Sequence, residues 1–585
     1  MRETPLGLAA CRFWIWPSII LAACVLTARA ERPATYCNPL DLDYRFQLDD
    51  PSRREAADPA VVYDGHEYWL FASKSGGYWH SPDFNHWTFV DGGSLPIEDY
   101  APAPAVINGA MYYTAFNTRA IYRADDARAG TWTKAGELQG YPDPDLFQDD
   151  DGRVFVYYGC SAGGGISAVE LDPAHDFRVI GQPVLCCKCD PPARGWELPG
   201  NHNAGVAEGE AITDTPWVEG AWMTKHSGKY YLQYAAPGTQ FHSYADGVCV
   251  GNSPLGPFTY APYSPFSHKP GGFITGAGHS GTFQDAANNW WRVSTMVISV
   301  RHMFERRIGL FPAGFSAGDG QMWCNTYLGD YPKYLPGTTG SAAPGRSPGW
   351  MLLSYAKPAE ASSTRPGFPV TNAFDENIQT WWCAATGNAG EWLKVDLGKT
   401  CRIEALQINF ADEGAQIHGR LHGDAYQYVV EGSSDGAEWK KILDRSDNHR
   451  DAPHDYTQLD RPVRSRFVRL VNVHCPAGTS FSVSGFRIFG DGLGRAPAAV
   501  NTLMAERASG DGRKATVFWP ASSGADFYVV RFGLAPDRLF DNCQIYNATT
   551  AQINSLNRGV TYYFTVDAVN DSGIARTKAI VRLNP

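Results

Sequence analysis

Residues 58–71 read DPAVVYDGHEYWLF, which is a short apolar run, a polar Asp-Gly turn and a second run rich in aromatic residues. Two such runs around a tight turn are typical of a β-hairpin. The same arrangement recurs four more times along the chain, in copies that begin at Pro104, Asp143, Glu219 and His279. Five copies in order indicate a repeat architecture built from one β unit.

Several copies are followed by a second hairpin that ends in a small polar motif and an aromatic residue, as in residues 81–87, 124–132 and 252–258. Four strands per unit, repeated five times, are typical of a β-propeller, in which radial repetition leaves only short sheet edges. We therefore expect an all-β protein in which residues 37–335 form a five-bladed β-propeller, followed by two β-sandwich domains. An irregular all-β domain with unrelated hairpins is the alternative, and five matched copies count against it.

The composition agrees with a large β protein that does not bind nucleic acid. The chain has 585 residues, enough for about three to four domains. Its 60 glycines and 39 prolines suit short strands joined by tight turns. The net charge is -11 at pH 7 and Lys and Arg form no run, so a nucleic-acid partner is not expected.

Residues 1–30 predict a signal peptide, because an apolar run at 13–26 follows basic residues and the segment 28–30 reads ARA, as at a cleavage site. The segment 21–24 reads LAAC, so a lipid anchor at Cys24 is the alternative. Either reading predicts a secreted, periplasmic or cell-surface protein. No later apolar stretch reaches the roughly 18 residues of a membrane span.

The first strand of each propeller blade lines the central channel, so residues at the start of each blade meet around one pocket. Three of the five repeats place a carboxylate there, Asp58, Asp143 and Glu219, and a fourth places His279. Two carboxylates across a pocket can hydrolyse a glycosidic bond, since one protonates the leaving oxygen and the other activates water. A third carboxylate nearby raises the pKa of the acid. Carboxylates on separate blades favour a wide separation, and roughly 6.5–9.5 Å predicts inversion at the anomeric carbon.

Three short motifs resemble those of a known family. Residues 57–59 read ADP, residues 143–152 read DPDLFQDDDG, and residues 218–222 read VEGAW. In this order they resemble the signature motifs of glycoside hydrolase family 43, a family of five-bladed β-propellers, across residues 37–335. One mild departure is the start of the second repeat, which reads YAP at 100–102 where the family often has Trp-Ala-Pro.

The resemblance implies Asp58 as the general base, Glu219 as the general acid and Asp143 as the residue that orients the acid and tunes its pKa. Three neighbouring carboxylates stay open as alternatives: Glu208 and Glu210 for the acid, and Asp145 for the tuning residue. Each motif alone is weak, because Asp-Pro pairs are common in turns.

Two further residues are candidates for binding the sugar. Trp217 lies two residues before Glu219, and its ring either stacks on a sugar or packs within the fold. His279 resembles the channel histidine of the family, which commonly binds a central water or cation. A buried structural histidine is the alternative, so a metal at His279 stays open.

Residues 352–490 carry the pattern of a second domain. Segments such as NAFDEN at 372–377 and YVVEGSSDG at 428–436 resemble a discoidin, or coagulation factor 5/8 type C, β-sandwich. The resemblance implies sugar binding and a structural calcium near Asp375. Glu376 stands where the family usually has glycine, which counts against the calcium, and a purely structural spacer is the alternative.

Residues 496–585 alternate like a further β-sandwich. Segments reading ATVFW at 515–519, FYVVR at 527–531 and YYFTV at 562–566 resemble a fibronectin type III domain. Such a domain is usually a spacer or docking module, so we expect no chemistry from it.

Thirteen cysteines are present, and 11 remain when Cys11 and Cys24 of the predicted signal peptide are set aside. An odd number leaves at least one without a cysteine partner in the chain. The segment 186–189 reads CCKC, but zinc sites usually have two separated ligand pairs and no second pair follows. We expect a disulfide-linked or solvated loop there, in an insertion between the third and fourth repeats.

Together these patterns predict an inverting glycoside hydrolase that requires no cofactor and acts on a polysaccharide or oligosaccharide. Removal of terminal or side-chain sugars is expected, with arabinofuranosyl or galactofuranosyl units favoured and xylosyl or galactosyl units as alternatives. A non-catalytic glycan-binding protein that uses the domain at 352–490 is the competing interpretation, and the complete set of three carboxylates counts against it.

Overall fold

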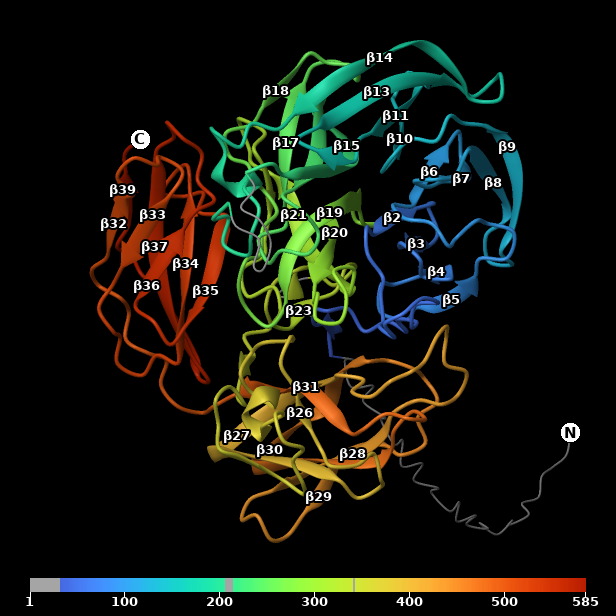
Figure 1. The fold of residues 1–585 in the computed structure, drawn as a ribbon. Helices are drawn as coiled ribbons and strands as arrows, with labels where there is room; N and C mark the ends of the chain where they lie inside the picture. The colour runs from blue at the N-terminus through green and yellow to red at the C-terminus, as the bar shows by residue number, and fades with distance from the viewer. Residues whose placement is uncertain (1–31, 206–213, 340–341) are drawn as a thin grey trace, which may run out of the picture. The chain divides into compact units, whose positions relative to one another are not determined.

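The computed structural model describes residues 32–205, 214–339 and 342–585, and Ala34–Pro585 form one compact unit. The regular structure described is almost entirely β-strand, with short 3-10 helices at Gly195–Glu197 and Val370–Ala373 (Figure 1). Four features predicted from the sequence lie outside the described residues: the signal peptide at 1–30, the lipid-anchor candidate Cys24, and the alternative acids Glu208 and Glu210.

Five antiparallel sheets follow one another along the first part of the chain. Blade 1 contains β2 (Ala60–Tyr63), β3 (Tyr68–Phe71), β4 (Gly77–Ser81) and β5 (Thr88–Asp91). Blade 2 contains β6 (Ala103–Ile107), β7 (Ala110–Thr114), β8 (Ala120–Asp126) and β9 (Thr131–Glu137). Blade 3 contains β10 (Asp145–Gln148), β11 (Val154–Tyr158), β13 (Gly165–Asp172) and β14 (Arg178–Lys188).

The last two blades are built in the same way. Blade 4 contains β15 (Trp217–His226), β16 (Lys229–Ala236), β17 (Ala245–Gly251) and β18 (Phe258–Tyr260), with the short β12 (Ser161–Ala162) paired to β15. Blade 5 contains β19 (Thr275–Gln284), β20 (Trp290–Val297), β21 (Arg306–Phe315) and β22 (Met322–Cys324).

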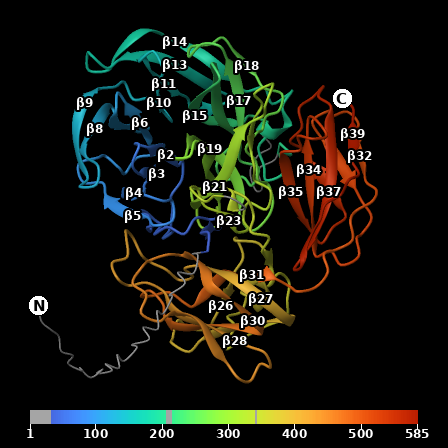
Figure 2. The same cartoon turned by 180° about the vertical axis from the view of Figure 1, so that it is seen from behind.

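The first strands of the blades contact one another in a closed ring, in the order β2, β6, β10, β15, β19 and back to β2. The ring is visible in Figures 1 and 2, where the labels of successive blades run around a common centre. The two ends of this region are joined by β1 (Thr35–Tyr36), which pairs antiparallel with β23 (Lys333–Tyr334). The predicted five-bladed β-propeller is confirmed, and its geometry directs the starts of all five blades to one centre.

A repeated turn holds the first hairpin in at least two blades. In blade 1, Asp64 accepts hydrogen bonds from two backbone amides of its turn and from the indole nitrogen of Trp69 at 2.8 Å. In blade 5, Asp285 does the same for Trp291, whose indole nitrogen lies 2.9 Å away. Trp291 is buried, so its N–H needs this acceptor.

The second domain contains eight strands around a single apolar core. They are β24 (Met351–Leu352), β25 (Ala359–Ala361), β26 (Trp382–Cys383), β27 (Trp392–Phe410), β28 (Gln427–Ser433), β29 (Lys440–Arg445), β30 (His454–His474) and β31 (Ser482–Asp491). The core includes the fully buried Trp382, Leu393 and Phe481.

The C-terminal region has two sheets that enclose a core around Trp519 and Phe564. Its strands are β32 (Met504–Arg507), β33 (Ala515–Phe518), β34 (Phe527–Gly533), β35 (Asp541–Tyr546), β36 (Thr550–Ile553), β37 (Tyr562–Asn570), β38 (Gly573–Ala575) and β39 (Val581–Leu583). The all-β fold class with two sandwiches after the propeller is confirmed, while the fibronectin type III assignment stays a prediction.

The cysteine segment at 186–189 differs in part from the expectation. Cys187 forms a disulfide with Cys249, which joins β14 of blade 3 to β17 of blade 4. The predicted loop is wrong for Cys186 and Cys187, because both lie in the outer strand β14, where Cys187 pairs with Ile166 of β13. The other nine described cysteines are free. No helix among the described residues is long and apolar enough to cross a membrane.

Replacing the turn carboxylate of blade 5 tests the role of the Asp–Trp hydrogen bond. We expect Asp285→Ala to lower the free energy of unfolding by about 1–3 kcal/mol, because the buried indole N–H of Trp291 loses its acceptor. Chemical denaturation followed by tryptophan fluorescence measures the change. The exposed Glu137→Ala serves as the control and is expected to stay within about 0.5 kcal/mol of the wild type. An unchanged denaturation midpoint for Asp285→Ala contradicts the assignment.

Candidate active site

A cavity of about 470 Å³ lies where the first strands of the blades converge. Each blade contributes at least one lining residue from its first strand or the segment just before it, and these include Asp58, Tyr100, Asp143, Glu219 and His279. The structure therefore brings the three predicted carboxylates and the predicted histidine together around one cavity. Its volume falls in the range of about 300–1,000 Å³ that is usual for small-molecule sites.

The backbone repeats the same unusual turn before the first strand in three blades. Asp58, Ala101 and Asp143 have φ values of 50°, 48° and 46°, and a proline follows each of them. Left-handed backbone is disfavoured for residues with a side chain and concentrates at functional sites. An amide from the end of the next strand bonds the preceding carbonyl in each case, for example Ser73 N to Ala57 O at 2.8 Å. In blades 1 and 3 the residue at this position lines the shared cavity, whereas in blade 2 Tyr100, just before Ala101, lines it.

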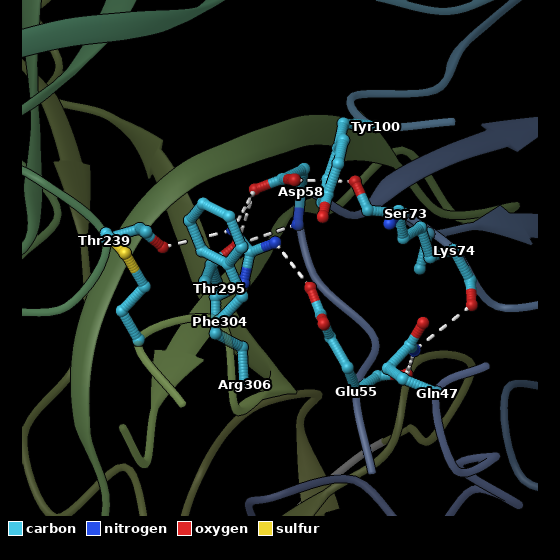
Figure 3. Close-up of polar contacts among 12 residues, drawn as sticks. Gln47, Glu55, Asp58, Ser73, Lys74, Tyr100, Thr239, Thr295, Phe304 and Arg306 are labelled. Carbon is cyan, nitrogen blue, oxygen red and sulfur yellow. Dashed lines mark hydrogen bonds and ion pairs between the residues drawn. The ribbon is translucent and has the colours of Figure 1, made fainter. Parts of the chain in front are cut away.

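Asp58 is buried and surrounded by hydrogen-bond donors (Figure 3). Ser73 donates to its Oδ2 at 2.5 Å, and Arg306 Nη1 lies 3.1 Å from its Oδ1. His279 Nδ1 lies 3.2 Å from the same oxygen, and Thr295 Oγ1 accepts the backbone N–H of Asp58 at 2.8 Å. Burial alone would raise the pKa of Asp58, but the charges of Arg306 and His279 and the hydrogen bonds outweigh burial and lower it.

Arg306, the first residue of β21, connects Asp58 to a second carboxylate. Its Nη2 donates to Glu55 Oε1 at 2.7 Å, and its Nη1 donates to Thr239 Oγ1 at 3.1 Å. Figure 3 shows the guanidinium between Asp58 and Glu55. Arginine is rarely buried unless it is paired, and Arg306 is 3% exposed with partners on two sides.

Glu219 lies in a different electrostatic environment in the same cavity. The hydroxyl of Tyr244 donates to its Oε1, and the thiol of Cys160 donates to its Oε2 at 3.6 Å. Burial raises the pKa of Glu219, and the carboxylate of Asp58 adds to this effect, while His279 and Tyr244 oppose it. The net direction is upward, so the protonated form is favoured relative to an ordinary glutamate.

His279 lies between carboxylates. Its Nδ1 is 3.2 Å from Asp58 Oδ1 and 3.5 Å from Asp143 Oδ2. Burial would lower the pKa of His279, but Asp58, Asp143 and Glu219 raise it overall. Burial raises the pKa of Asp143 to about 7, with a further contribution from Glu219 and Asp58, against the opposing charge of His279. Asp143 Oδ2 also accepts the backbone N–H of Gly220 at 3.3 Å, directly beside the predicted acid.

Asp145, the alternative to Asp143 as the tuning residue, lies in a different position. Asp145 accepts the backbone N–H of Met223 at 2.6 Å and does not line the cavity. Burial raises the pKa of Asp145 to about 7, as it does for Asp143, so titration alone does not distinguish the two. Their geometry does, because only Asp143 faces the cavity.

Trp217 presents an apolar surface to the cavity. Its side chain is 44% exposed, and its indole nitrogen donates to Cys160 Sγ at 3.2 Å. Tyr100 and Phe304 also line the cavity, with ring centroids 5.6 Å apart. Aromatic surfaces beside a few polar groups are typical of sites that bind small ligands.

Comparisons with known proteins agree with this geometry. Residues 52–310 match the model of glycosyl hydrolases family 43, and residues 358–483 match the F5/8 type C domain. The chain contains a family 43 glycosyl hydrolase domain. Asp58, Asp143 and Glu219 all lie inside the matched range of this domain.

Individual relatives match only part of this chain. A beta-xylosidase from Xylanibacter ruminicola is 33% identical over 133 residues, which is 20% of this chain and 39% of the relative. A beta-D-galactofuranosidase, xynD, from Aspergillus niger is 31% identical over 120 residues, which is 20% of this chain and 27% of the relative. The chain spans from 27% to 56% of the length of the curated relatives it matches. A solved structure described as "Glycoside hydrolase" has 18% identity and a TM-score of 0.43, covering 77% of this chain and 100% of its own.

Several residues around the family 43 site were not predicted from the sequence. Arg306, Tyr244 and Cys160 contact Asp58 or Glu219 but belong to no repeated motif. One signal was available for Arg306, because the charged residues at 305–307 directly precede the apolar run IGLF at 308–311. A buried charge at the start of a strand needs a partner, and the partner here is catalytic in the predicted scheme.

Three side chains around the cavity lie close enough together to offer ligands to a metal ion. Among the described residues, the cluster able to offer three ligand atoms within 4.8 Å of one another is Asp143, Cys160 and Glu219. His279 turns its Nδ1 toward two carboxylates.

The predicted calcium site near Asp375 does not fit the loop around it. Asp375 accepts hydrogen bonds from Thr380 Oγ1 at 2.6 Å and from Asn377 N at 3.0 Å. The neighbouring Glu376 forms a bidentate ion pair with Arg487 instead of facing a cation. Calcium needs six to eight oxygen ligands, including carboxylates, and this loop leaves no second carboxylate available.

The thiol of Cys160 provides a test of the cavity that needs no substrate. Burial and the carboxylates of Asp143 and Glu219 raise the pKa of this thiol, so it reacts slowly with alkylating reagents. At a pH above the pKa of Glu219, we expect Glu219→Gln to increase the rate of iodoacetamide labelling at Cys160 severalfold, because the negative charge of the ionised carboxylate is removed. Cys186 is the internal control, since burial alone raises its pKa to about 12. Peptide mass spectrometry measures both rates, and equal rates at Cys160 in the two proteins contradict the predicted contact.

Proposed function

We propose that this protein is an inverting glycoside hydrolase that removes terminal or side-chain sugars from a polysaccharide or oligosaccharide. The observation that carries the proposal is that one cavity places Asp58 beside the cation Arg306 and Glu219 beside the uncharged donors Tyr244 and Cys160. The pKa of Asp58 is lowered and that of Glu219 is raised, relative to their ordinary values. Pairs of carboxyl groups whose environments separate their pKa values are typical of acid and base partners.

Asp58 is suited to be the general base. Ion pairing with Arg306 keeps it ionised, so it can accept a proton from a water molecule that attacks the anomeric carbon. Ser73 fixes its second oxygen at 2.5 Å, which limits rotation of the carboxylate. A base held in one orientation lowers the entropic barrier to the attack.

Glu219 is suited to be the general acid, and Asp143 to be its tuning partner. The raised pKa of Glu219 favours the protonated carboxyl, which can donate its proton to the leaving glycosidic oxygen. Asp143 is anchored to the backbone of Gly220, next to Glu219, and both carboxyls lie in the same buried cluster. A like charge close to the acid disfavours its ionisation.

For the sugar, we propose an arabinofuranosyl or galactofuranosyl unit first, with xylosyl and galactosyl units as alternatives. The relatives include proteins named for xylosidase, arabinosidase and galactofuranosidase activities, which supports this set without separating its members. We further propose that the protein acts outside the cytoplasm, on the basis of the predicted signal peptide at residues 1–30.

Substrates with leaving groups of different acidity distinguish the two roles. We expect Glu219→Gln to lower kcat by about 10²- to 10⁴-fold on an unactivated oligosaccharide, because the leaving oxygen is no longer protonated. The loss is expected to be much smaller on a dinitrophenyl glycoside, whose leaving group needs no proton. Asp58→Asn is expected to lose activity on both substrates alike. Equal losses for Glu219→Gln on the two substrates contradict its role as the acid.

Two controls complete this experiment. Asp145→Asn keeps an acceptor for Met223 and is expected to retain activity, whereas Asp143→Asn is expected to lose it. Proton NMR of the first-formed sugar identifies the anomer, and a retained anomer contradicts inversion. If the wild type binds sugar and releases no product from arabinofuranosides, galactofuranosides, xylosides or galactosides, the glycan-binding interpretation replaces the hydrolase.

The pH dependence of kcat/KM tests the electrostatic assignment. Activity is lost as pH falls through the pKa of Asp58, where the base becomes protonated, and as pH rises through the pKa of Glu219, where the acid ionises. Because Arg306 lowers the pKa of Asp58, we expect Arg306→Gln to move the acidic limb to higher pH. Arg306→Lys keeps the charge and should move the limb less. An acidic limb that is unchanged in Arg306→Gln contradicts the assignment of Asp58 as the base.

A further inference from the structure

Arg306 contacts Asp58 and Glu55, and next to each of Arg306 and Glu55 along the chain stands an arginine that faces the opposite way. Glu55 and Arg306 contact each other on the side of Asp58. Their neighbours Arg54 and Arg307 instead contact the F5/8 type C domain. Since successive side chains in extended backbone point to opposite faces, each segment joins the cavity to the second domain through adjacent residues.

Arg54 lies fully buried between two carboxylates of the second domain. Its Nη1 and Nη2 are 2.7 and 2.8 Å from the two oxygens of Asp451, and its Nε is 2.9 Å from Asp412 Oδ2. Side chains of all three residues are at most 6% exposed. Such a bidentate, desolvated pairing fixes the guanidinium in one orientation.

Arg307 makes a parallel connection. Its Nε donates to His454 Nε2 at 2.8 Å, and its Nη1 donates to the carbonyl of Arg54 at 2.7 Å. His454 is in turn held by Asn409 through its Nδ1 at 2.8 Å. The side chain of Arg307 thus ties the backbone next to Glu55 to the strand that carries Arg306.

The second domain also contacts two propeller loops whose residues line the cavity. Gln379 donates to the carbonyl of Ile298 and lies 2.9 Å from His242 Nε2 through its Oε1. The segment after Ile298 carries the cavity residues Met303 and Phe304, and the segment before His242 carries Gly238, Thr239 and Gln240. Arg301, in the first loop, donates to the carbonyl of Ala411 at 2.5 Å.

We propose that the F5/8 type C domain is a built-in part of the active site, in which Asp412, Asp451 and Gln379 act as positioning residues for the base and the cavity wall. The proposal rests on the proposed hydrolase function for its catalytic consequence. The acidic pair of the second domain fixes Arg54, and the attached segment places Glu55 against Arg306 and thereby Arg306 against Asp58. The loop around Gln379 is engaged with the propeller, so it is not free to bind a separate glycan.

Asp451→Asn in the full-length chain is the main test. The substitution keeps the shape and leaves Asp412 as a partner for Arg54, so the chain should fold. We expect kcat/KM to fall about 10- to 100-fold, since small displacements of a catalytic group remote from the mutation lower rates by this order. The acidic limb of the pH profile should also move to higher pH, because Arg306 is held less firmly beside Asp58. The charged groups facing Asp58 are Arg306 and His279, with Glu55, Asp143 and Glu219 in the same cluster.

Glu431→Gln is the matched control. Glu431 forms an ion pair with Arg469 inside the second domain, at 2.6 Å, and lies outside the contacts with the propeller. Its substitution should leave both kcat/KM and the pH profile within about twofold of the wild type, as expected for a surface ion pair. Gln379→Ala should raise KM more than it lowers kcat, because it releases the cavity wall and not the base.

The outcomes separate this inference from the proposed function. Loss of activity in Asp451→Asn with a displaced acidic limb supports the inference, while an unchanged profile or a loss that is uniform at every pH overturns it. If the wild type hydrolyses none of the glycosides, the proposed function fails on its own. Hydrogen exchange then decides the inference: faster exchange at 298–307 in Asp451→Asn than in Glu431→Gln supports it, and equal exchange overturns it.

Discussion

The ion pair between Arg306 and Asp58 is the interaction on which the active site depends. Both side chains are buried, and burial by itself favours a neutral carboxyl group. The guanidinium, together with the hydroxyl of Ser73, reverses that preference and keeps Asp58 ionised. Removing the cation would leave the buried carboxylate with Ser73, Thr295 and His279 only, and breaking a buried ion pair by removing one partner is strongly destabilising. The fold therefore prepares Asp58 for its proposed role as the base before any substrate arrives.

In the same cavity, the neighbours of Glu219 leave its pKa raised, whereas the neighbours of Asp58 lower the pKa of that residue. No cation pairs directly with its oxygens among the described contacts; a tyrosine hydroxyl and the thiol of Cys160 do so instead. Asp143 lies close by and has a raised pKa of its own. One propeller channel thus holds a carboxyl group that favours ionisation and another that favours protonation, because each blade contributes a different set of neighbours.

The repeat explains why part of the site could be predicted from the sequence. Asp58, Asp143 and Glu219 occupy the starts of blades, and a closed ring of first strands brings those starts together whatever the loops do. Arg306 and Tyr244 could not be found in this way, because their role depends on how later strands pack. The contact between Arg306 and Asp58 joins residues 248 apart in the sequence, and no local pattern encodes such a pairing.

In the second domain too, sequence motifs predict the fold but not the contacts of individual side chains. Short motifs indicate its β-sandwich fold, yet whether its loop can bind a cation depends on single side chains such as Glu376. This residue stands at the usual glycine position, takes a left-handed φ of 60° and forms a buried bidentate pair with Arg487. A carboxylate aimed at an internal arginine cannot also serve a cation in the loop. Asp412 and Asp451 pair with Arg54, and His454 accepts a hydrogen bond from Arg307, so these three side chains are directed to the propeller, as expected for a fixed structural partner.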